Sequence, residues 1–267
     1  LTSFSASGAT DNWGCQLAGQ DPCPSRQFDT YIGSNPDLEA EESETFSLGV
    51  EYAFFDTWEA SINYFDVTLT NSIEYTSAQD QLNVDFQSQG GNPAVQRDAN
   101  GLVIEISAGF QNGGTDFNFN GIDYQLGGVV ETDLGSFRVD LKSTNYMNYD
   151  YELTYGTGEL GDAVGTLGFP EWRSTAFVSW SLDKWFVNLS ADYIGESEEK
   201  IGDEKFDSWH ILNASLGYSL DAMGTIRVGA NTLTDEDPLL NEFGSMADEY
   251  QYPITGRVVY VDYTLDF

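Results

Sequence analysis

The sequence predicts an all-β fold, a transmembrane antiparallel β-barrel segment. Three observations predict it. Apolar residues recur at every second position in about nine segments, short and long connections alternate between these segments, and ionised side chains fall almost entirely on one of their two faces. A period of two indicates strands with one apolar and one polar face. Aromatic residues make up 14% of the 267 residues and 27 residues are glycine, a composition that suits strands and turns.

The final stretch, 254–267, shows the pattern most clearly. Counting back from Phe267, every second residue is apolar or aromatic: Leu265, Tyr263, Val261 and Val259. Aromatic rings favour the boundary between lipid headgroups and hydrocarbon. We therefore expect a strand that ends at a membrane surface.

Eight earlier segments repeat this alternation, and with the final one they give nine strands. They are Phe46–Phe54, Trp58–Tyr64, Ile122–Val130, Phe137–Tyr149, Ala176–Leu182, Val187–Tyr193, Leu212–Leu220 and Ile226–Ala230. Short breaks fall at 56–57, 132–135, 183–184 and 221–224. Long polar connections cover 68–116, 152–170, 195–207 and 234–253, the first with a possible short strand at Leu102–Ile106. Short turns on one rim and long loops on the other are typical of outer-membrane barrels.

Charge placement agrees with this interpretation. On the faces predicted to point outward, the only ionised residue is Asp66, at the outer end of its strand. The opposite faces carry Glu51, Glu59, Asp123, Arg138, Asp140, Lys142, Arg173, Asp192, Arg227, Arg257, Asp262 and Asp266. A cation that faces lipid at mid-bilayer costs about 2–4 kcal/mol, whereas a lumen face tolerates it. The inward cations either form a polar wall for a plug or solute, or neutralise the inward carboxylates; the second reading is preferred.

Composition excludes several classes of function. With 44 acidic and 10 basic residues, the net charge is −34, which argues against nucleic acid and anionic lipid headgroups as specific partners. The acidity favours solubility or adaptation to a salty medium, with divalent cation binding as the alternative. No run approaches 18 apolar residues, so no transmembrane helix is expected. The single histidine, His210, is predicted to face outward at a rim, and nothing near it suggests a hydrolytic triad, so we expect no enzyme and no cofactor.

The segment 1–42 is predicted to be an extracellular loop region, and 43–267 the barrel segment. Cys15 and Cys23 are the only cysteines, and an even count in an exported protein suggests one disulfide; a metal pair is the alternative. No signal peptide is visible at Leu1, which is consistent with a mature protein or a piece of a longer one.

Nine strands do not make a complete barrel. Bacterial single-chain barrels have an even number of strands, and an open sheet would leave unpaired backbone groups that lipid cannot satisfy. We therefore expect the carboxy-terminal part of a larger barrel.

Four motifs resemble those of TonB-dependent outer-membrane receptors. The stretch 35–41 (NPDLEAE) resembles the family's NPxLxPE, with Ala40 in place of the usual proline. The stretch 169–173 (FPEWR) looks like its PxWR, and 229–238 (GANTLTDEDP) like its GxxNLxDxxP, with Thr232 where Asn or Leu is commoner. Gly256-Arg257 before a final strand ending in Phe completes the series. Each motif is weak alone, but the four occur in the family's order.

The resemblance implies that the nine strands are the fourteenth to twenty-second of a 22-stranded barrel that imports a nutrient ligand such as a siderophore, cobalamin or an oligosaccharide. It implies a plug domain, a short amino-terminal TonB box and a TonB-type periplasmic energy-coupling partner; the plug and the TonB box are not in this sequence. It also implies extracellular long loops, periplasmic short turns and recognition of the final alternation by the barrel assembly machinery.

Two groups of residues are candidate sites. Tyr146, Tyr149, Tyr151 and Tyr155 cluster near the base of one loop, where their rings could stack on a ligand, although an aromatic girdle explains most of them. The acidic run 235–237 has oxygen ligands that suit calcium, but a turn and salt-bridge role is preferred.

Two rival interpretations remain. One is a passive porin or structural outer-membrane barrel, which would lack a plug. The other is a soluble secreted β-sandwich that binds carbohydrate, in which the apolar face would be the buried one.

Overall fold

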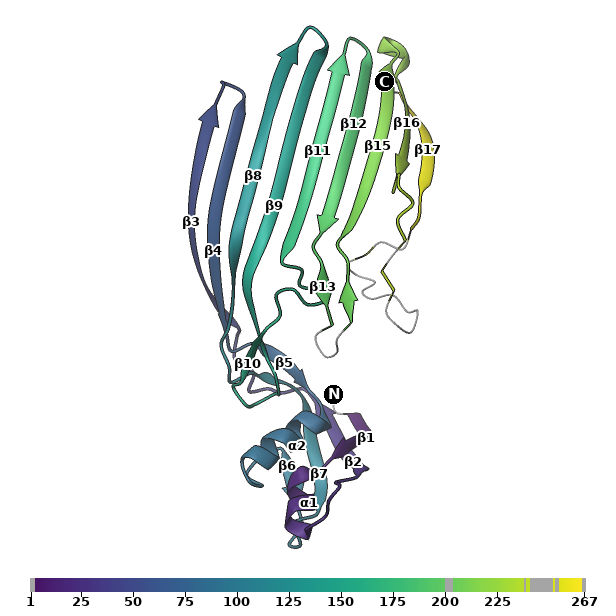
Figure 1. Cartoon of the computed structure of the whole chain (residues 1–267). Coiled ribbons are helices and arrows are strands. Elements are labelled where there is room, and N and C mark those ends of the chain that lie inside the picture. The colour runs from purple at the N-terminus through teal and green to yellow at the C-terminus, as the bar shows by residue number, and fades with distance from the viewer. Residues whose placement is uncertain (1–2, 200–203, 238, 241–251, 253–254, 266–267) are drawn as a thin grey trace. The chain divides into compact units, whose positions relative to one another are not determined.

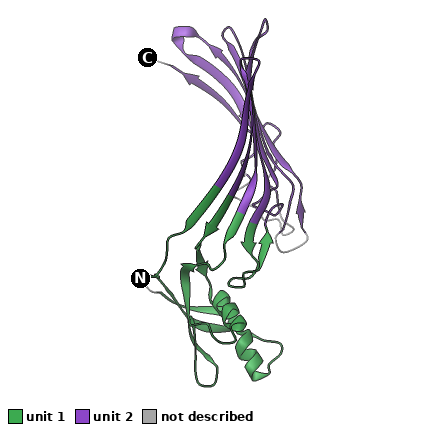
Figure 2. Ribbon diagram, turned by 90° about the vertical axis from the view of Figure 1, so that its left-hand side faces the viewer, with its two compact units in different colours: residues 1–45, 67–118, 150–162 green, residues 46–66, 119–149, 163–267 purple. Residues whose placement is uncertain are grey.

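The computed structural model describes residues 3–199, 204–237, 239–240, 252 and 255–265. The predicted end of the final strand, at Asp266 and Phe267, lies outside these residues. The chain forms two compact units (Figure 2). Unit 1 comprises Leu1–Thr45, Val67–Asn118 and Asp150–Asp162, and unit 2 comprises Phe46–Asp66, Phe119–Tyr149 and Ala163–Phe267.

The main sheet contains the nine predicted strands in their predicted order (Figure 1). Its path runs β3-β4-β8-β9-β11-β12-β15-β16-β17, so neighbours in sequence are neighbours in space. The bounds are β3 Glu42–Phe54, β4 Trp58–Thr70, β8 Phe117–Thr132, β9 Gly135–Glu152, β11 Trp172–Leu182, β12 Trp185–Ile194, β15 Trp209–Ser219, β16 Thr225–Asn231 and β17 Val258–Thr264. The all-β prediction is confirmed.

The connections sort by length as predicted. Four short ones, at 55–57, 133–134, 183–184 and 220–224, lie at one end of the sheet, at the top in Figure 1, and the last contains the 3₁₀ helix η1 (Asp221–Met223). The longer connections of unit 2 leave from the other end. One of them carries the small ribbon of β13 (Ser197–Glu198) and β14 (Lys205–Phe206).

Two glycines in the sheet are covered by aromatic rings of the neighbouring strand. Gly217 pairs with Phe186, and a Cβ added to Gly217 would lie 1.9 Å from Phe186 Cζ. Gly229 pairs with Tyr260, whose Cζ would be 2.5 Å from an added Cβ. The rings replace the packing surface that glycine lacks, so a larger residue at either position would displace them.

Unit 1 differs from the sequence expectation. The segment 1–42, predicted to be a loop, contains β1 (Ser3–Thr10), α1 (Asn12–Ala18) and β2 (Ser25–Gly33). The polar stretch 68–116 contains β5 (Ile73–Thr76), α2 (Ala78–Gln87), β6 (Val95–Arg97) and β7 (Val103–Asn112), and β10 (Leu160–Asp162) pairs with the end of β9. The sheet order is β1-β2-β7-β5, with β6 also paired to β7. The two stretches therefore fold together, joined by the parallel pair β2 and β7.

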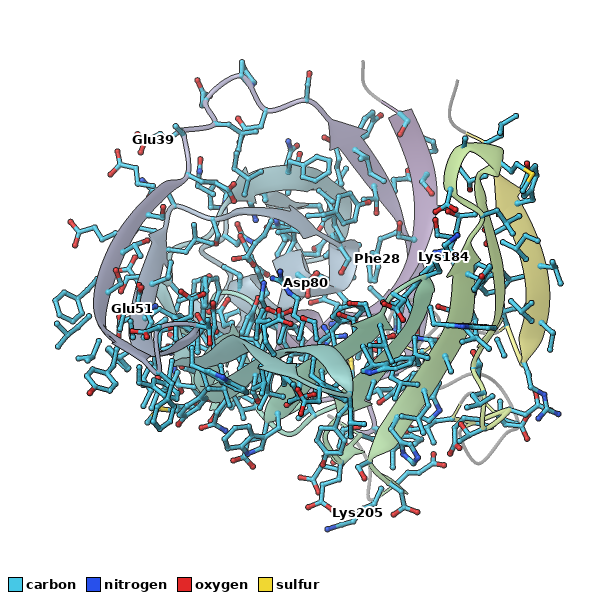
Figure 3. All side chains as sticks on the ribbon, turned by 90° about the horizontal axis from the view of Figure 1, so that it is seen from above. Phe28, Glu39, Glu51, Asp80, Lys184 and Lys205 are labelled. Atoms are coloured by element: carbon cyan, nitrogen blue, oxygen red, sulfur yellow. A yellow bond between two sulfur atoms is a disulfide. The ribbon has the colours of Figure 1, made fainter. Side chains whose placement is uncertain are left out.

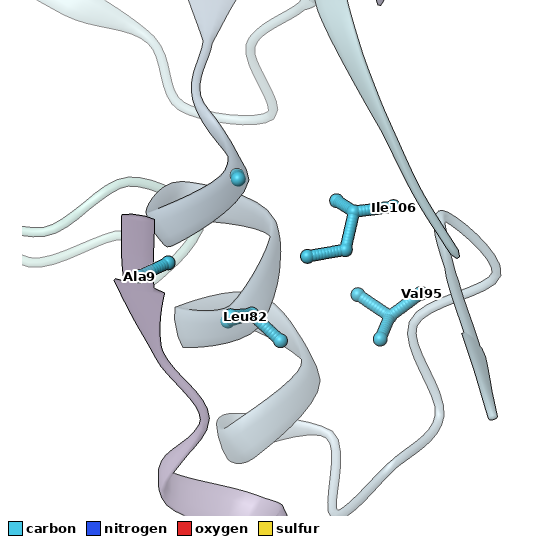
Figure 4. Packing of buried hydrophobic residues seen from close by; sticks show 5 residues of the cluster. Ala9, Leu82, Val95 and Ile106 are labelled. Atoms are coloured by element: carbon cyan, nitrogen blue, oxygen red, sulfur yellow. The ribbon is translucent and has the colours of Figure 1, made fainter. Parts of the chain in front are cut away.

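A small hydrophobic core holds unit 1 together (Figure 4). Its buried members are Ala9, Ala78, Leu82, Val95 and Ile106, with Phe28 and Val103 packed against them. Helix α2 begins with a capping box, in which the Ser77 side chain accepts from the Asp80 N–H and the Asp80 carboxylate accepts from the Ser77 N–H. The cap fixes where α2 begins and so presents Ala78 and Leu82 to the sheet.

A buried ion triad links three segments of unit 1. Arg97 Nη2 lies 2.7 Å from Asp11 Oδ1 and 2.5 Å from Asp85 Oδ2, and the Asp85 side chain is fully buried. Asp11 also caps α1 by accepting from the Gly14 N–H at 2.9 Å. Burial alone would raise the pKa of Asp11, but the hydrogen bonds from Arg97 and Gly14 and the charges of Arg97 and Arg26 hold this pKa below its ordinary value of 3.8.

A disulfide joins Cys15 in α1 to Cys23 in the following loop. This pairing is the one expected from the even cysteine count. No helix in the described part of the chain is long and apolar enough to cross a membrane.

Candidate functional site

One face of the unit 2 sheet is covered by apolar side chains that pair across the strands. We call it the apolar face. One of its rows runs Val139, Val178, Leu189, Ala214, Ala230 and Val259. In this row and the next, Leu189, Leu216 and Val261 are 47%, 46% and 71% exposed, so the face is not a sealed core. Exposed apolar rows on a sheet suit contact with lipid.

Aromatic residues border the apolar face at both ends. Toward the short turns, the rings of Trp185 and Tyr218 lie 4.6 Å apart; toward the long connections, Tyr124 stacks on Trp172 at 5.9 Å. His210 pairs with Tyr193 in the second border, which is the rim position predicted for it. Tyr218 and His210 are eight positions apart on β15, about 26 Å at roughly 3.3 Å per residue. The apolar band of an outer-membrane barrel is about 25 Å tall.

The other side of the sheet is the charged face. Arg138, Asp140 and Lys142 alternate with Val139 and Leu141 along β9 and therefore point to the opposite side. Figure 3 shows that the sheet is curved, with Glu51 on the hollow side. One hollow on that side is lined by Glu51 together with Glu59, Asp140 and Lys142, which places the charged face on the inside of the curve.

Two of the five inward cations pair with inward carboxylates, and a third pairs with an acidic residue of the connection after β16. Arg138 Nε lies 2.7 Å from Asp140 Oδ2, Arg227 Nε lies 2.9 Å from Asp262 Oδ2, and Arg257 Nη2 lies 3.6 Å from Asp235 Oδ2. Lys142 and Arg173 form no ion pair with any residue that the structure describes. The predicted neutralisation of inward carboxylates therefore holds for two of the five, Arg138 and Arg227.

The contact of Asp235 explains the acidic run 235–237. Asp235 accepts a hydrogen bond of 2.6 Å from the Arg257 N–H, so two of the four family-like motifs meet at this point. Asp235 thus takes the predicted turn and salt-bridge role. Among the described residues, no three His, Cys, Asp or Glu side chains gather in a way that could hold a metal ion.

The charged face is hollowed beside β12 and β15. A hollow of about 580 Å³ is lined by amide and hydroxyl side chains, including Asn188, Ser190, Asn213, Ser215 and Tyr260. A second hollow, of about 390 Å³, contains Lys142 and Arg173. Hydroxyl, amide and cationic groups can hydrogen-bond to a polar solute or to polypeptide.

A bulge in β9 changes the side on which two of the candidate tyrosines lie. Gly121 pairs with Tyr146 but Asn120 pairs with Asn148, so Met147 is an extra residue. Strict alternation would put Tyr149 with Leu141 on the apolar face. Because Tyr149 instead pairs with Phe119, two positions from Gly121, Tyr146 and Tyr149 both share the charged face.

Aromatic neighbours surround both tyrosines. The Tyr149 ring lies 4.3 Å from that of Phe169 and 5.6 Å from that of Phe119, and Tyr146 meets Phe65 edge-on at 6.3 Å. This arrangement differs from the aromatic girdle that was preferred from the sequence for most of the tyrosines.

The other two candidate tyrosines belong to unit 1. The Tyr151 ring covers Gly161 of the paired strand β10, where an added Cβ would lie 2.9 Å from Tyr151 Cζ. Gln111 Nε2 donates to Tyr155 Oη at 2.6 Å. Burial raises the pKa of Tyr155, and the carboxylates of Glu74, Glu152 and Asp80 raise this pKa further, against the lowering effect of Gln111.

An ordered antiparallel sheet with an apolar face, two aromatic borders and a charged concave face defines a class of protein, the outer-membrane barrels. The family model that matches residues 2–233 is described as TonB dependent receptor-like, beta-barrel, and the chain belongs to this family.

Solved structures of receptors have the same fold. The siderophore receptor PirA from Acinetobacter baumannii is 17% identical with a TM-score of 0.63, and the match covers 98% of this chain and 35% of PirA. A mutant of the ferric enterobactin receptor PfeA from Pseudomonas aeruginosa is 15% identical with a TM-score of 0.60, covering 97% of this chain and 36% of PfeA. FpvA from P. aeruginosa, solved with pyoverdines, is 16% identical with a TM-score of 0.54, and the match covers 84% of this chain and 27% of FpvA.

The chain therefore spans about a third of the length of the receptors it matches. No curated protein matches the sequence.

Proposed function

We propose that the chain forms the last nine strands of a TonB-dependent transporter in the bacterial outer membrane. The single observation that carries the proposal is the family match over residues 2–233, on a sheet whose two faces suit lipid and a polar lumen. The long connections face the medium, the short turns face the periplasm, and the rest of the barrel and a plug domain complete the transporter. The role is import of a small nutrient, with no catalytic step.

A ferric siderophore is the first candidate ligand. The names of the similar structures support it, because PirA is a siderophore receptor and PfeA was solved in complex with enterobactin. The Tyr146 and Tyr149 rings on the charged face offer surfaces on which an aromatic chelate could stack. Tyr151 and Tyr155, which belong to unit 1, are proposed as ligand contacts in their own right. A TonB-type protein in the periplasm is the proposed energy-coupling partner.

Uptake of radioactive iron tests the proposal. A strain that lacks the complete receptor is compared with its parent under iron limitation, with a panel of ferric siderophores supplied one at a time. We expect the parent to import at least one of them, and this import to stop when the receptor, the proton-motive force or TonB is removed. A passive porin would give uptake that persists without TonB. Absence of any receptor-dependent uptake across iron chelates, cobalamin and oligosaccharides would overturn the transport proposal.

A further inference from the structure

Lys142 and Arg173 are exceptional among the cations of this chain. The structure describes nine of the ten lysines and arginines, and six of the nine form ion pairs. In a chain with 44 acidic residues, a cation that is left without a carboxylate partner stands out. Two such cations, Lys142 and Arg173, lie on the charged face, one strand apart.

The register brings these two side chains together. Lys142 on β9 pairs with Thr175 on β11, and Arg173 pairs with Thr144, so Lys142 and Arg173 are diagonal neighbours on one face. Diagonal neighbours in an antiparallel pair are about 7–8 Å apart, within reach of long side chains. Both line the hollow of about 390 Å³. Two like charges at this separation repel each other, and an anion between them would relieve the repulsion.

The floor of the hollow is apolar. Ile194 pairs with Arg173, and Ile194, Trp209 and Ile211 are all buried members of one cluster. Apolar surroundings lower the local dielectric and strengthen the attraction between an anion and the two cations.

One carboxylate, Asp192, also lines the hollow and is a diagonal neighbour of Arg173. Asp192 Oδ1 accepts from Thr175 Oγ1 at 2.9 Å, and the nearby Asp123 accepts from Thr144 Oγ1 at 2.7 Å. With two cations and one carboxylate in its lining, the hollow keeps a net positive charge. On its other side Lys142 also lines the hollow that contains Glu51, Glu59 and Asp140, of which Asp140 is held by Arg138. Arg173 thus lines only the hollow of about 390 Å³, whereas Lys142 lies between this hollow and the one lined by Glu51 and Glu59.

We propose that Lys142 and Arg173 form a binding site for a carboxylate or similar oxyanion group. The planar guanidinium of Arg173 can bind two oxygens of such a group, and Lys142 adds a second positive charge. The anionic group comes either from a solute or from a carboxylate of the same receptor's polypeptide. The solute source rests on the proposed transport function, whereas the site itself rests on the geometry.

The position of the site suits a solute that arrives from the side of the long connections. Arg173 follows Trp172, which belongs to the aromatic border at that end of the apolar face, and Lys142 follows Leu141, one row below that border. Both cations therefore lie in the half of the sheet away from the short turns.

Calorimetric titration of the complete, purified receptor with citrate at low ionic strength tests the solute source. We expect citrate to bind the unchanged receptor, with affinity that falls steeply as salt is added. The double variant Lys142→Gln/Arg173→Gln should bind citrate at least tenfold more weakly. Arg173→Lys keeps the positive charge but loses the planar guanidinium that can bind two oxygens at once, so its affinity for citrate should be intermediate. Arg138→Gln is the matched control, because it removes a cation on the same face that Asp140 already neutralises.

Thermal unfolding of the same variants tests the internal source. If a carboxylate of the polypeptide occupies the site, the unchanged receptor will not bind citrate, and the double variant will unfold at a lower temperature than the unchanged protein. Citrate binding that the double variant retains in full would overturn the proposal, as would a receptor that neither binds citrate nor loses thermal stability in the double variant. Neither measurement requires transport, so a failed uptake experiment leaves these results intact.

Discussion

Arg97 Nη2 lies 2.5 Å from Oδ2 of Asp85, a carboxylate whose side chain is completely buried. The same guanidinium also pairs with Asp11, so a single cation bridges two acids contributed by separate segments of unit 1. Removing one partner of a buried ion pair leaves an uncompensated buried charge, which costs about 3–5 kcal/mol.

The substitution Arg97→Met should therefore destabilise unit 1 by about 3–5 kcal/mol. Arg26→Met is the control. The Arg26 side chain is exposed, hydrogen-bonds to Gln20 Oε1 at 3.3 Å, and acts on Asp11 through its charge without forming an ion pair with any described residue. We expect this substitution to change stability by less than about 0.5 kcal/mol. Hydrogen exchange of the amides of α2 and β6 in the complete receptor measures both effects. Equal protection in the two variants would show that the triad does not stabilise unit 1.

Acid should weaken unit 1 through Asp11. The folded pKa of Asp11 lies below 3.8, so the carboxylate contributes stability that is fully present above pH 3.8 and is lost as the pH falls through the folded pKa. Asp11→Asn should lower the stability of unit 1 at neutral pH. It should also reduce the loss of stability on acidification, because the variant has no carboxylate at this position to protonate. Limited proteolysis of unit 1 across this range measures the change, and an acid response in Asp11→Asn as steep as that of the unchanged protein would contradict the prediction.

A cation placed on one face of β12 should destabilise the protein much more than a cation placed on the other face. Leu189 sits in the middle row of the apolar face, between Val178 and Ala214, and Asn188 is its neighbour on the charged face. Leu189→Arg should cost about 2–4 kcal/mol in a bilayer, whereas Asn188→Arg should cost about 1 kcal/mol or less. Urea unfolding in lipid vesicles measures the difference. A soluble sandwich would also be destabilised by Leu189→Arg, but it would fold without lipid or detergent, and such folding of the complete protein would refute the membrane assignment.

The sequence predicted the nine-stranded sheet well because its strands, apart from the bulge in β9, obey one simple rule. Leu189, Leu216 and Val261 lie on the apolar face, whereas Arg138 and Arg227 lie on the charged face. An alternation with a period of two therefore assigns each residue to its face from its immediate neighbours in sequence. Unit 1 obeys no such rule. Strand β1 reads SFSASGAT, in which serines alternate with Phe4, Ala6 and Gly8, but its buried residue Ala9 lies in the serine register. Ala9 meets Leu82 and Ile106 only after the distant strands β2 and β7 pair.

One local signal in the sequence could have reduced the errors. The capping box of Ser77 and Asp80 is a recognisable start for α2 within the stretch taken as a polar loop. By contrast, the bulge at Met147 has no counterpart in the alternation, since one extra residue in β9 is visible only against its partner strand β8. This is why strict alternation places Tyr149 with the apolar residues of β9 although it shares a face with Tyr146.

Deleting Met147 should test this account of β9. The deletion removes the extra residue while Tyr146 keeps Gly121 as its partner and Tyr149 keeps Phe119, so β9 would become regular and both tyrosines would stay on the charged face. Deleting Leu141, which lies in the regular part of the strand opposite Leu126 and Ala176, would instead move each residue on one side of the gap to the wrong face. We expect the first variant to assemble almost as well as the unchanged receptor and the second to fail, measured as the yield of heat-resistant folded receptor in outer membranes. If both deletions fail equally, the bulge is needed for assembly in its own right, and β9 tolerates no change of length.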